Sequence, residues 1–208
     1  MSIVPLPKSL GLQIDGRRQR SAQGRRRVAL SMLELIREQG SAPSMDEVAI
    51  HAKVSRRSAF RYFEDVPALE LAALRLMREE VQKHHPLPHP RGDVHTRMAK
   101  VVEHRGDIFA FMSPLLRLAQ ARREGHPEIH RELVDLRFSQ REHLMVVFTE
   151  ELAALSPDIR DDRLHALEMV CGFDAHHALR EGQQCTEAQA RRVTLQLMQA
   201  TLLRSKMR

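Results

Sequence analysis

The sequence contains few aromatic residues, few glycines and almost no cysteine. Among its 208 residues there are seven Phe, one Tyr, no Trp, nine Gly and two Cys. Ala, Leu, Met, Arg and Glu are abundant instead, and runs of β-branched residues are rare. Because these abundant side chains lose little rotamer freedom on a helical backbone, the composition predicts an all-α protein.

Long apolar segments are missing as well. No stretch approaches the roughly 20 apolar residues that a membrane-spanning helix requires, and the first residues lack the apolar segment of a signal peptide. Cys171 and Cys185 are far from a CxxC spacing, which favours reduced, unbridged thiols because disulfides are rare in the cytosol. We therefore expect a cytoplasmic protein that does not span a membrane.

Motifs that carry catalysis are also missing. The sequence has no G-x-S-x-G, no Gly-rich phosphate loop and no paired-carboxylate signature. His126 and His130 are four positions apart on a predicted helix, but Glu128 is not placed as in H-E-x-x-H and no third ligand is evident. We expect no enzymatic activity, no metal and no cofactor; an enzyme built on a helical bundle is one alternative.

Positive charge, in contrast, is concentrated at one end of the chain. Residues 1–27 hold seven of the 33 basic residues and one of the 27 acidic residues, Asp15, so the rest of the chain carries 26 of each sign. The proline and glycine residues of this segment predict a disordered basic arm over residues 1–25. Such an arm suits a polyanion, although a solvated tail without a partner is the alternative.

Apolar spacing then predicts a small helical domain over residues 26–85. A helix over 26–39 repeats its apolar residues every three or four positions and ends at Gly40. Ser44 and Glu47 form an S-x-x-E capping box that begins a second, short helix. Ser55 is the expected N-cap of a third helix, and a fourth is expected from Val66 to His84.

Pro86, Pro88 and Pro90 mark the expected boundary with a second domain over residues 86–208. This domain is predicted to be a helical bundle with helices at 94–104, 106–123, 127–154, 159–182 and 186–204, with Pro114 breaking or bending the second. The final helix is apolar on more than one side. We expect a second subunit to cover it, so the last two helices are predicted to form a homodimer.

The second and third helices, joined by a tight turn, form the pattern of a helix-turn-helix that reads double-stranded DNA. Ala59, Phe60 and Phe63 are expected to anchor the third helix to its neighbours. Arg56, Arg57 and Arg61 are expected to face outward, where arginine can bond guanine edges or phosphates.

The residues of this region resemble the tetracycline-repressor (TetR) family of bacterial regulators. The similarity covers residues 26–77, with ALSMLELIREQG in the first helix, MDEVA in the second, and VSRRSAFRYF where the family shows V-S-x-x-T-L-Y-x-H/Y-F. The resemblance implies a homodimer with nine or ten helices per subunit. It also implies an N-terminal DNA-binding domain and a C-terminal domain that dimerises and binds an effector.

Individual contacts follow from the same resemblance. Ser58 stands at the position of a phosphate-binding Thr, and Tyr62 at that of a His or Tyr that touches the DNA backbone. Two family phosphate contacts are missing, since Phe60 replaces a Tyr and Val66 a Lys. Lys53 replaces a turn glycine, which predicts a non-glycine residue at positive φ. The predicted DNA contacts are Ser44, Lys53, Ser55, Arg56, Arg57, Ser58, Arg61 and Tyr62.

An effector pocket in the C-terminal domain is predicted from the side chains on its expected helices. Aromatic, Met and His side chains gather on the predicted helices there, and ordinary core packing is the competing interpretation. The candidates are Phe109, Met112, Leu116, Met145, Phe148, Met169, Phe173, His176 and His177.

Together these features predict a ligand-responsive transcriptional regulator, more often a repressor than an activator. It would bind a palindromic DNA operator as a homodimer and respond to a small-molecule effector that the sequence does not identify. The remaining alternative is a protein-interaction or membrane-surface module that uses its basic arm.

Overall fold

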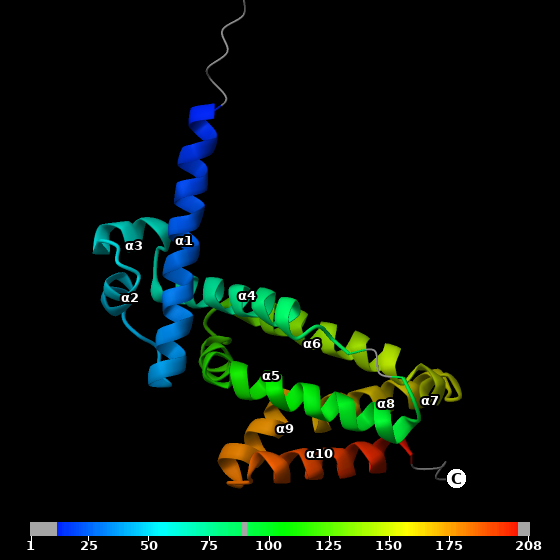
Figure 1. Cartoon of the computed structure of the whole chain (residues 1–208). Helices are drawn as coiled ribbons and strands as arrows, with labels where there is room; N and C mark the ends of the chain where they lie inside the picture. Colours follow the sequence, from blue (N-terminus) through cyan, green and yellow to red (C-terminus); the bar gives the residue numbers. More distant parts are fainter. Residues whose placement is uncertain (1–11, 89–90, 204–208) are drawn as a thin grey trace, which may run out of the picture. The chain divides into compact units, whose positions relative to one another are not determined.

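The computed structural model describes residues 12–88 and 91–203, and every regular element in these ranges is helical (Figure 1). The predicted all-α class is confirmed. The elements are α1 (Leu12–Gln39), α2 (Met45–His51), α3 (Arg56–Tyr62), α4 (Val66–His84), α5 (Val94–Arg122), α6 (Pro127–Val147), α7 (Thr149–Ala153), α8 (Pro157–Val170), α9 (Phe173–His177), a π-helical turn (Ala178–Gly182) and α10 (Glu187–Leu202). None of the helices in the described ranges is long and apolar enough to cross a membrane.

The chain separates into two compact units, Met1–Leu76 and Met77–Arg208. The sequence placed the boundary between residues 85 and 86, in the proline-rich segment, whereas the units divide within α4. One contact explains why the end of α4 belongs with the second unit: Arg78 forms an ion pair of 2.8 Å with the buried carboxylate of Glu132 on α6. The helix α4 nevertheless runs without a break from the first unit into the second, because its residues favour helix throughout.

The first unit is built around one face of α1. Val28, Met32 and Ile36 are fully buried there, at the three- and four-residue spacing that the sequence predicts. Both short helices, α2 and α3, contact α1 and each other. Met45, Val48 and Ala49 of α2 and Ala59 of α3 complete this small core.

The beginning of α1 corrects the sequence prediction. A disordered arm was expected over residues 1–25, but the helix begins at Leu12; residues 1–11 lie outside the described part of the chain. Residues 12–25 contain Leu, Gln, Ala and several Arg, which all favour helix. Extending an existing helix needs no new nucleus, so the amphipathic helix that was expected from residue 26 continues toward the N-terminus.

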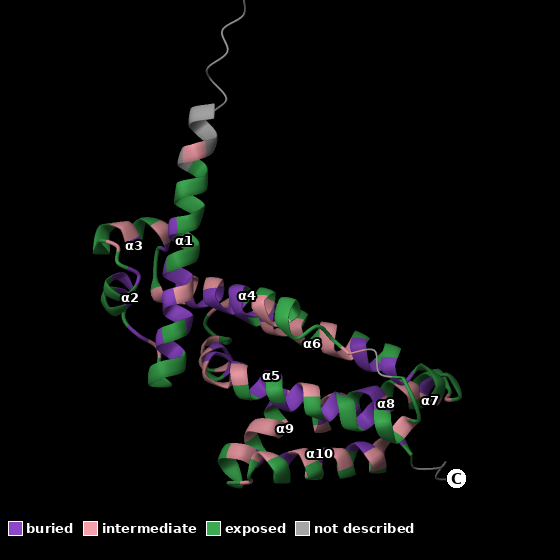
Figure 2. Ribbon diagram, viewed as in Figure 1, coloured by how far each residue is buried: buried purple, intermediate pink, exposed green. Residues whose placement is uncertain are grey.

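In the second unit, α5 packs against α6, α9 and α10, and α8 packs against α6, α9 and α10. The buried residues of these helices form one apolar cluster, drawn in purple in Figure 2. Its members include Met98, Val101, Leu144, Phe148, Leu164, Leu167 and Met198. The Arg105 side chain of α5 donates two hydrogen bonds to backbone carbonyls of other helices. One goes to Cys171, at the end of α8, at 2.8 Å, and the other to Gln140 of α6, at 3.1 Å.

Two helices predicted at 94–104 and 106–123 are in fact the single helix α5. Gly106, next to the expected gap, is buried inside it, and a Cβ there would lie 2.7 Å from Glu187 Oε1 and 2.9 Å from Arg191 Nε. The glycine therefore admits α10 at close range and does not end the helix. Pro114 does not end it either.

The helices predicted at 127–154 and 159–182 are each divided. The first is interrupted at Phe148, which is fully buried and leaves the helical conformation between α6 and α7. The second is interrupted at Gly172, where a Cβ would lie 2.6 Å from the carbonyl oxygen of Glu168. A tight turn that only glycine fits thus separates α8 from α9.

Candidate functional site

The turn between α2 and α3 has the geometry that the sequence predicts. The Ser44 and Glu47 side chains form both halves of the capping box at the start of α2, and the Ser55 side chain accepts a 3.2 Å hydrogen bond from the Ser58 amide at the start of α3. Between them Lys53 adopts φ +53°, so the prediction of a non-glycine residue at positive φ is confirmed. Two fixed caps on either side of this residue set the angle between the two helices.

The buried side of α3 is narrower than expected. Ala59 and Phe63 are buried, as predicted. The prediction that Phe60 anchors the helix is wrong, because its side chain is 43% exposed. The guanidinium of Arg56 instead lies 5.6 Å from the centre of the Phe60 ring, at a distance typical of a cation–π contact.

The outward side of α3 carries the three predicted arginines, all exposed. Arg56 is held in place by Asp46 of α2, whose carboxylate lies 3.1 Å from its Nε atom. Arg61 lies over the ring of Tyr62, with its Cζ atom 5.2 Å from the ring centre. The structure therefore leaves three guanidinium groups of α3 exposed.

The remaining predicted contact residues lie around this surface. Ser44, Lys53 and Ser55 are exposed, whereas Ser58 and Tyr62 are half-buried. The Ser44 hydroxyl and the Ser44 backbone amide each donate to Glu47 Oε2 at 2.7 Å, and these two hydrogen bonds lower the pKa of Glu47. The Ser55 and Ser58 hydroxyls lie 2.9 Å apart. Contact with a phosphate would thus compete with the bonds that cap the two helices, and these roles stay predictions.

A second basic surface lies on α1. Arg18, Arg20, Arg26 and Arg27 are exposed, and most of this part of α1 is green in Figure 2. Arg25, also exposed, lies with its guanidinium 4.7 Å from the ring centre of Phe63, the residue that follows α3. Sequence reasoning identified this charge but placed it on an irregular arm. The helix fixes the direction in which these side chains leave the backbone.

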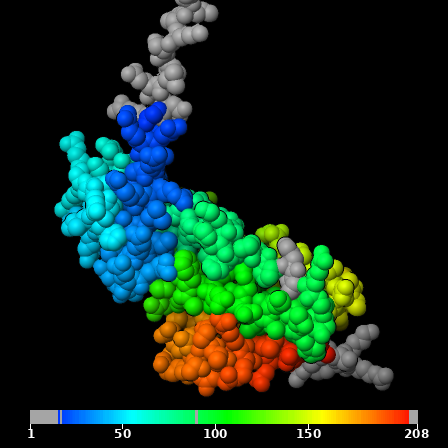
Figure 3. Space-filling model, viewed as in Figure 1, coloured from blue at the N-terminus to red at the C-terminus, as the bar shows by residue number. Residues whose placement is uncertain are grey.

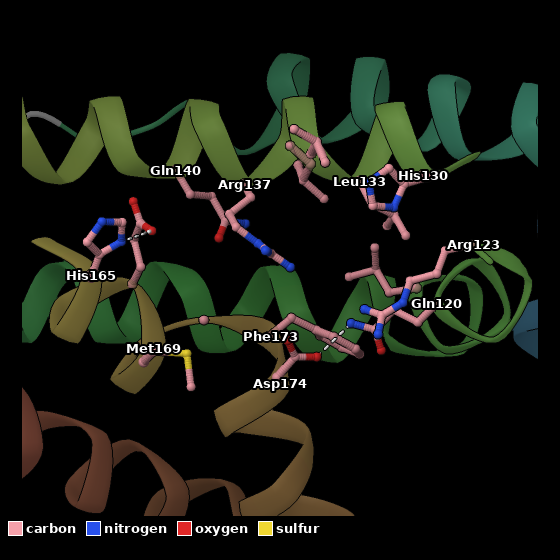
Figure 4. Close-up of a pocket in the computed structure, with 15 residues that line it drawn as sticks. Gln120, Arg123, His130, Leu133, Arg137, Gln140, His165, Met169, Phe173 and Asp174 are labelled. Atoms are coloured by element: carbon pink, nitrogen blue, oxygen red, sulfur yellow. Dashed lines mark hydrogen bonds and ion pairs between the residues drawn. The ribbon is translucent and has the colours of Figure 1, made fainter. Parts of the chain in front are cut away.

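In the second unit, a pocket of about 400 Å³ lies between α5, α6, α8 and α9 (Figure 4). Three of the predicted effector-pocket residues, Leu116, Met169 and Phe173, line it. The other lining residues include Gln120 and Arg123 of α5, His130, Leu133, Val134, Arg137 and Gln140 of α6, and Asp174 of α9. The volume falls within the range of about 300 to 1,000 Å³ that is common for small-molecule sites.

The other predicted pocket residues lie elsewhere. Met112 and Phe148 are buried in the core, and Met145 is exposed, so none of the three lines this pocket. Phe109 and His176 border a small separate cavity, and the burial of His176 lowers its pKa. His177 stacks on Phe173 at 5.7 Å behind the pocket wall. The predicted set combined residues from different helix faces, so only part of it lines this pocket.

One signal could have found the missed residues. His130, Leu133, Val134 and Arg137 follow the i, i+3, i+4, i+7 spacing of one helix face, and they all line the pocket. A face that mixes apolar and cationic side chains in this way is unlike a core face. No group of three or more His, Cys, Asp or Glu in the described residues could hold a metal ion.

Two solved structures share this arrangement of helices. A Mesorhizobium loti protein assigned to the TetR family of transcriptional regulators aligns over 88% of this chain and 97% of its own, with a TM-score of 0.63 and 16% identity. The multidrug binding protein EbrR, in complex with imidazole, aligns over 83% of this chain and 93% of its own, with a TM-score of 0.57 and 19% identity.

The chain has the TetR-family fold. The resemblance noted over residues 26–77 therefore extends, as a fold, along most of the chain. No protein-family model and no curated protein matches the sequence. At identities of 16% and 19%, the similarity is one of backbone arrangement.

Proposed function

We propose that this chain is a ligand-responsive transcriptional regulator that binds a palindromic DNA operator as a homodimer. The observation that carries the proposal is the set of three exposed arginines on α3, Arg56, Arg57 and Arg61, while Ala59 of the same helix is buried. A helix with this charge on its outer face suits the major groove, where arginine bonds the O6 and N7 atoms of guanine. The TetR fold, shared with a protein assigned to a family of transcriptional regulators, supports the same function.

Both basic surfaces contribute in this proposal. Arg57 reaches base edges. The side chain of Arg56 is oriented by its stacking on Phe60 and its ion pair with Asp46. The exposed arginines of α1 neutralise phosphates. They take the place of the two phosphate contacts that the family has and that Phe60 and Val66 cannot make in this chain.

The homodimer is proposed to form through α8 and α10, which pack against each other. Ile159 of α8 and Leu197 of α10 are 49% and 42% exposed, and both line one shallow depression with Ala166 and Ala200. Figure 3 shows α10, in orange to red, along the surface of its unit. Two copies of this face would cover each other's apolar residues about a two-fold axis.

The pocket between α5, α6, α8 and α9 is the proposed effector site. An effector that binds one conformation of the dimer better than another shifts the population between them and so changes operator affinity. We propose that the operator-bound state is the effector-free one, which makes the protein a repressor. It would act in the cytoplasm, without catalysis and without a membrane.

The test is selection of bound fragments from a library of genomic DNA with the purified full-length protein, followed by footprinting. We expect protection of two half-sites with two-fold symmetry, separated by about one helical turn, roughly 34 Å, or a related spacing. Replacing Arg18 and Arg20 with Ala should weaken binding to all sequences alike, because these residues would contact phosphates. Binding to anionic vesicles without any sequence-selective DNA complex would instead support the membrane-surface alternative.

A further inference from the structure

The pocket between α5, α6, α8 and α9 has a charged end and an apolar wall. Leu116, Leu133, Val134, Met169 and Phe173 supply apolar surface. Arg123, at the end of α5, and Arg137, on α6, bring two guanidinium groups to the same space. In Figure 4 the Arg137 side chain extends from α6 into the gap between the helices.

The two carboxylates of the pocket are already engaged. Asp174 Oδ1 accepts a 2.6 Å hydrogen bond from Gln120 Nε2. Glu168 Oε1 accepts a 3.0 Å hydrogen bond from Arg141 Nη1, and Arg141 also pairs with Asp161 at 3.0 Å. Each carboxylate thus already has a hydrogen-bond partner on the protein, a cation for Glu168 and a neutral amide for Asp174.

The two lining arginines are in the opposite state. Within residues 12–88 and 91–203, neither the Arg123 nor the Arg137 side chain has a hydrogen-bond or ion-pair partner. His130 is exposed on the same face of α6, one turn before Leu133 and two turns before Arg137. It adds a further hydrogen-bond donor to the pocket. A shallower neighbouring hollow, which shares Gln120, Arg123 and Asp174, brings Arg117 to the same end of the pocket.

We infer that this pocket binds an amphipathic organic anion, a carboxylate on an apolar body. The carboxylate lies between Arg123 and Arg137, where charge-assisted hydrogen bonds are geometrically specific. The apolar body lies against Leu116, Met169 and Phe173, and the flexible Met side chain adapts to its shape. The inference rests on the proposed function only in taking this pocket as the effector site; it adds the chemical class of the effector.

The experiment compares three probes with the same ten-carbon chain: decanoate, 1-decanol and decyltrimethylammonium. Binding to the full-length protein is measured by isothermal titration calorimetry below the micellar range of each probe. The expected result is that decanoate binds about tenfold more tightly than either of the others, because one charge-assisted contact is worth about that factor. Equal or tighter binding of decyltrimethylammonium, or no binding of any probe, overturns the inference.

Two variants locate the effect. Arg137→Gln should reduce the preference for decanoate over decanol at least fivefold, whereas Arg131→Gln, which removes an exposed charge from α6 outside the pocket, should leave it unchanged. Equal effects of the two variants overturn the assignment of Arg137. Since Arg137 is exposed, its replacement should not unfold the protein, and circular dichroism checks this.

DNA binding, measured separately by electrophoretic mobility shift, distinguishes the two proposals. Selective DNA binding together with a preference for the cationic probe contradicts the inference and leaves the proposed function intact. A preference for decanoate without any selective DNA binding supports the anion site and contradicts the proposed function. Release of DNA by decanoate, but not by decanol at the same concentration, supports both.

Discussion

The backbone of Gly24 on α1 lies directly against the phenol ring of Tyr62 at the end of α3. A Cβ atom at position 24 would lie 2.3 Å from Tyr62 Oη and 2.7 Å from its Cζ atom. Gly24 is itself buried, although the residues on both sides of it are exposed. The glycine thus lets α3, with its arginines, approach α1, and it couples the two basic surfaces through one aromatic side chain.

This relationship predicts a dependence between two substitutions. Replacing glycine by alanine inside a helix normally stabilises it by about 1 kcal/mol. We expect that gain for Gly24→Ala only in a Tyr62→Ala background, and no gain or a loss in the wild type, where the new methyl group displaces the ring. Urea denaturation of the four proteins measures the coupling. The same gain in both backgrounds would show that Tyr62 does not occupy this position.

Lys53 makes a second prediction about the same unit. Its φ of +53° is costly for any residue with a Cβ atom. Lys53→Gly should therefore raise the free energy of unfolding by about 1 kcal/mol. Lys53→Ala, which removes the same charge but keeps the Cβ, should give no such gain. Both should weaken DNA binding to the same degree if Lys53 contacts a phosphate; unequal losses would assign its role to backbone geometry.

How far the sequence predicted the fold depends on where helices were expected to end. The two caps at Ser44 and Ser55 were predicted because each depends on residues three positions apart, and the positive φ at Lys53 was predicted from the turn glycine of the family. The roles of Gly106 and Gly172 were not predicted. Gly106 lies against side chains of α10, which are distant in sequence, and a local pattern carries no information about such an approach. Gly172 meets the carbonyl of Glu168, four residues earlier, once the chain turns there, and the residue pattern does not specify that turn.

The candidate sites divide in the same way. Arg56, Arg57 and Arg61 are all exposed, as predicted. Phe60 was expected to be buried because it is aromatic, but Arg56 covers its ring at the surface instead. The pocket residues that were missed include Arg123 and Arg137, which sequence patterns ordinarily assign to solvated helix faces.

His104 of α5 predicts a pH dependence of stability. Burial, followed by the nearby charges of His143 and Arg105, lowers its pKa from 6.5 to about 4. Below pH 6.5 the unfolded chain binds a proton that the folded chain excludes until the pH approaches 4. The free energy of unfolding should therefore fall as the pH decreases through this window and be independent of this residue above it.

The measurement is chemical denaturation at several pH values between 4 and 8. His104→Gln should flatten the decrease across the window, because glutamine does not titrate. His95→Gln, at an exposed position on the same helix, serves as the matched control and should keep the wild-type profile. If the two variants give the same profile, the buried imidazole of His104 does not control acid stability.

The proposed dimer makes a prediction about Leu197 of α10. Leu197→Glu places a charge in the apolar depression that this residue shares with Ile159 of α8. We expect the variant to be monomeric at concentrations where the wild type is a dimer, because a buried, unpaired carboxylate destabilises an interface. Gln196→Glu adds the same charge at the adjacent exposed position and should remain dimeric. Sedimentation velocity measures both; a dimeric Leu197→Glu protein would place the interface elsewhere.

The central claim is that α3 reads DNA sequence, and the most direct test is the salt dependence of binding to a selected operator and to a scrambled duplex. Fluorescence anisotropy should show steeply falling affinity with added salt and tighter binding to the operator. Arg57→Ala should remove most of the difference between the two duplexes, a loss of about 1 to 3 kcal/mol. Arg37→Ala, in the last turn of α1, should keep that difference. An Arg57→Ala protein as selective as the Arg37→Ala control would contradict the account.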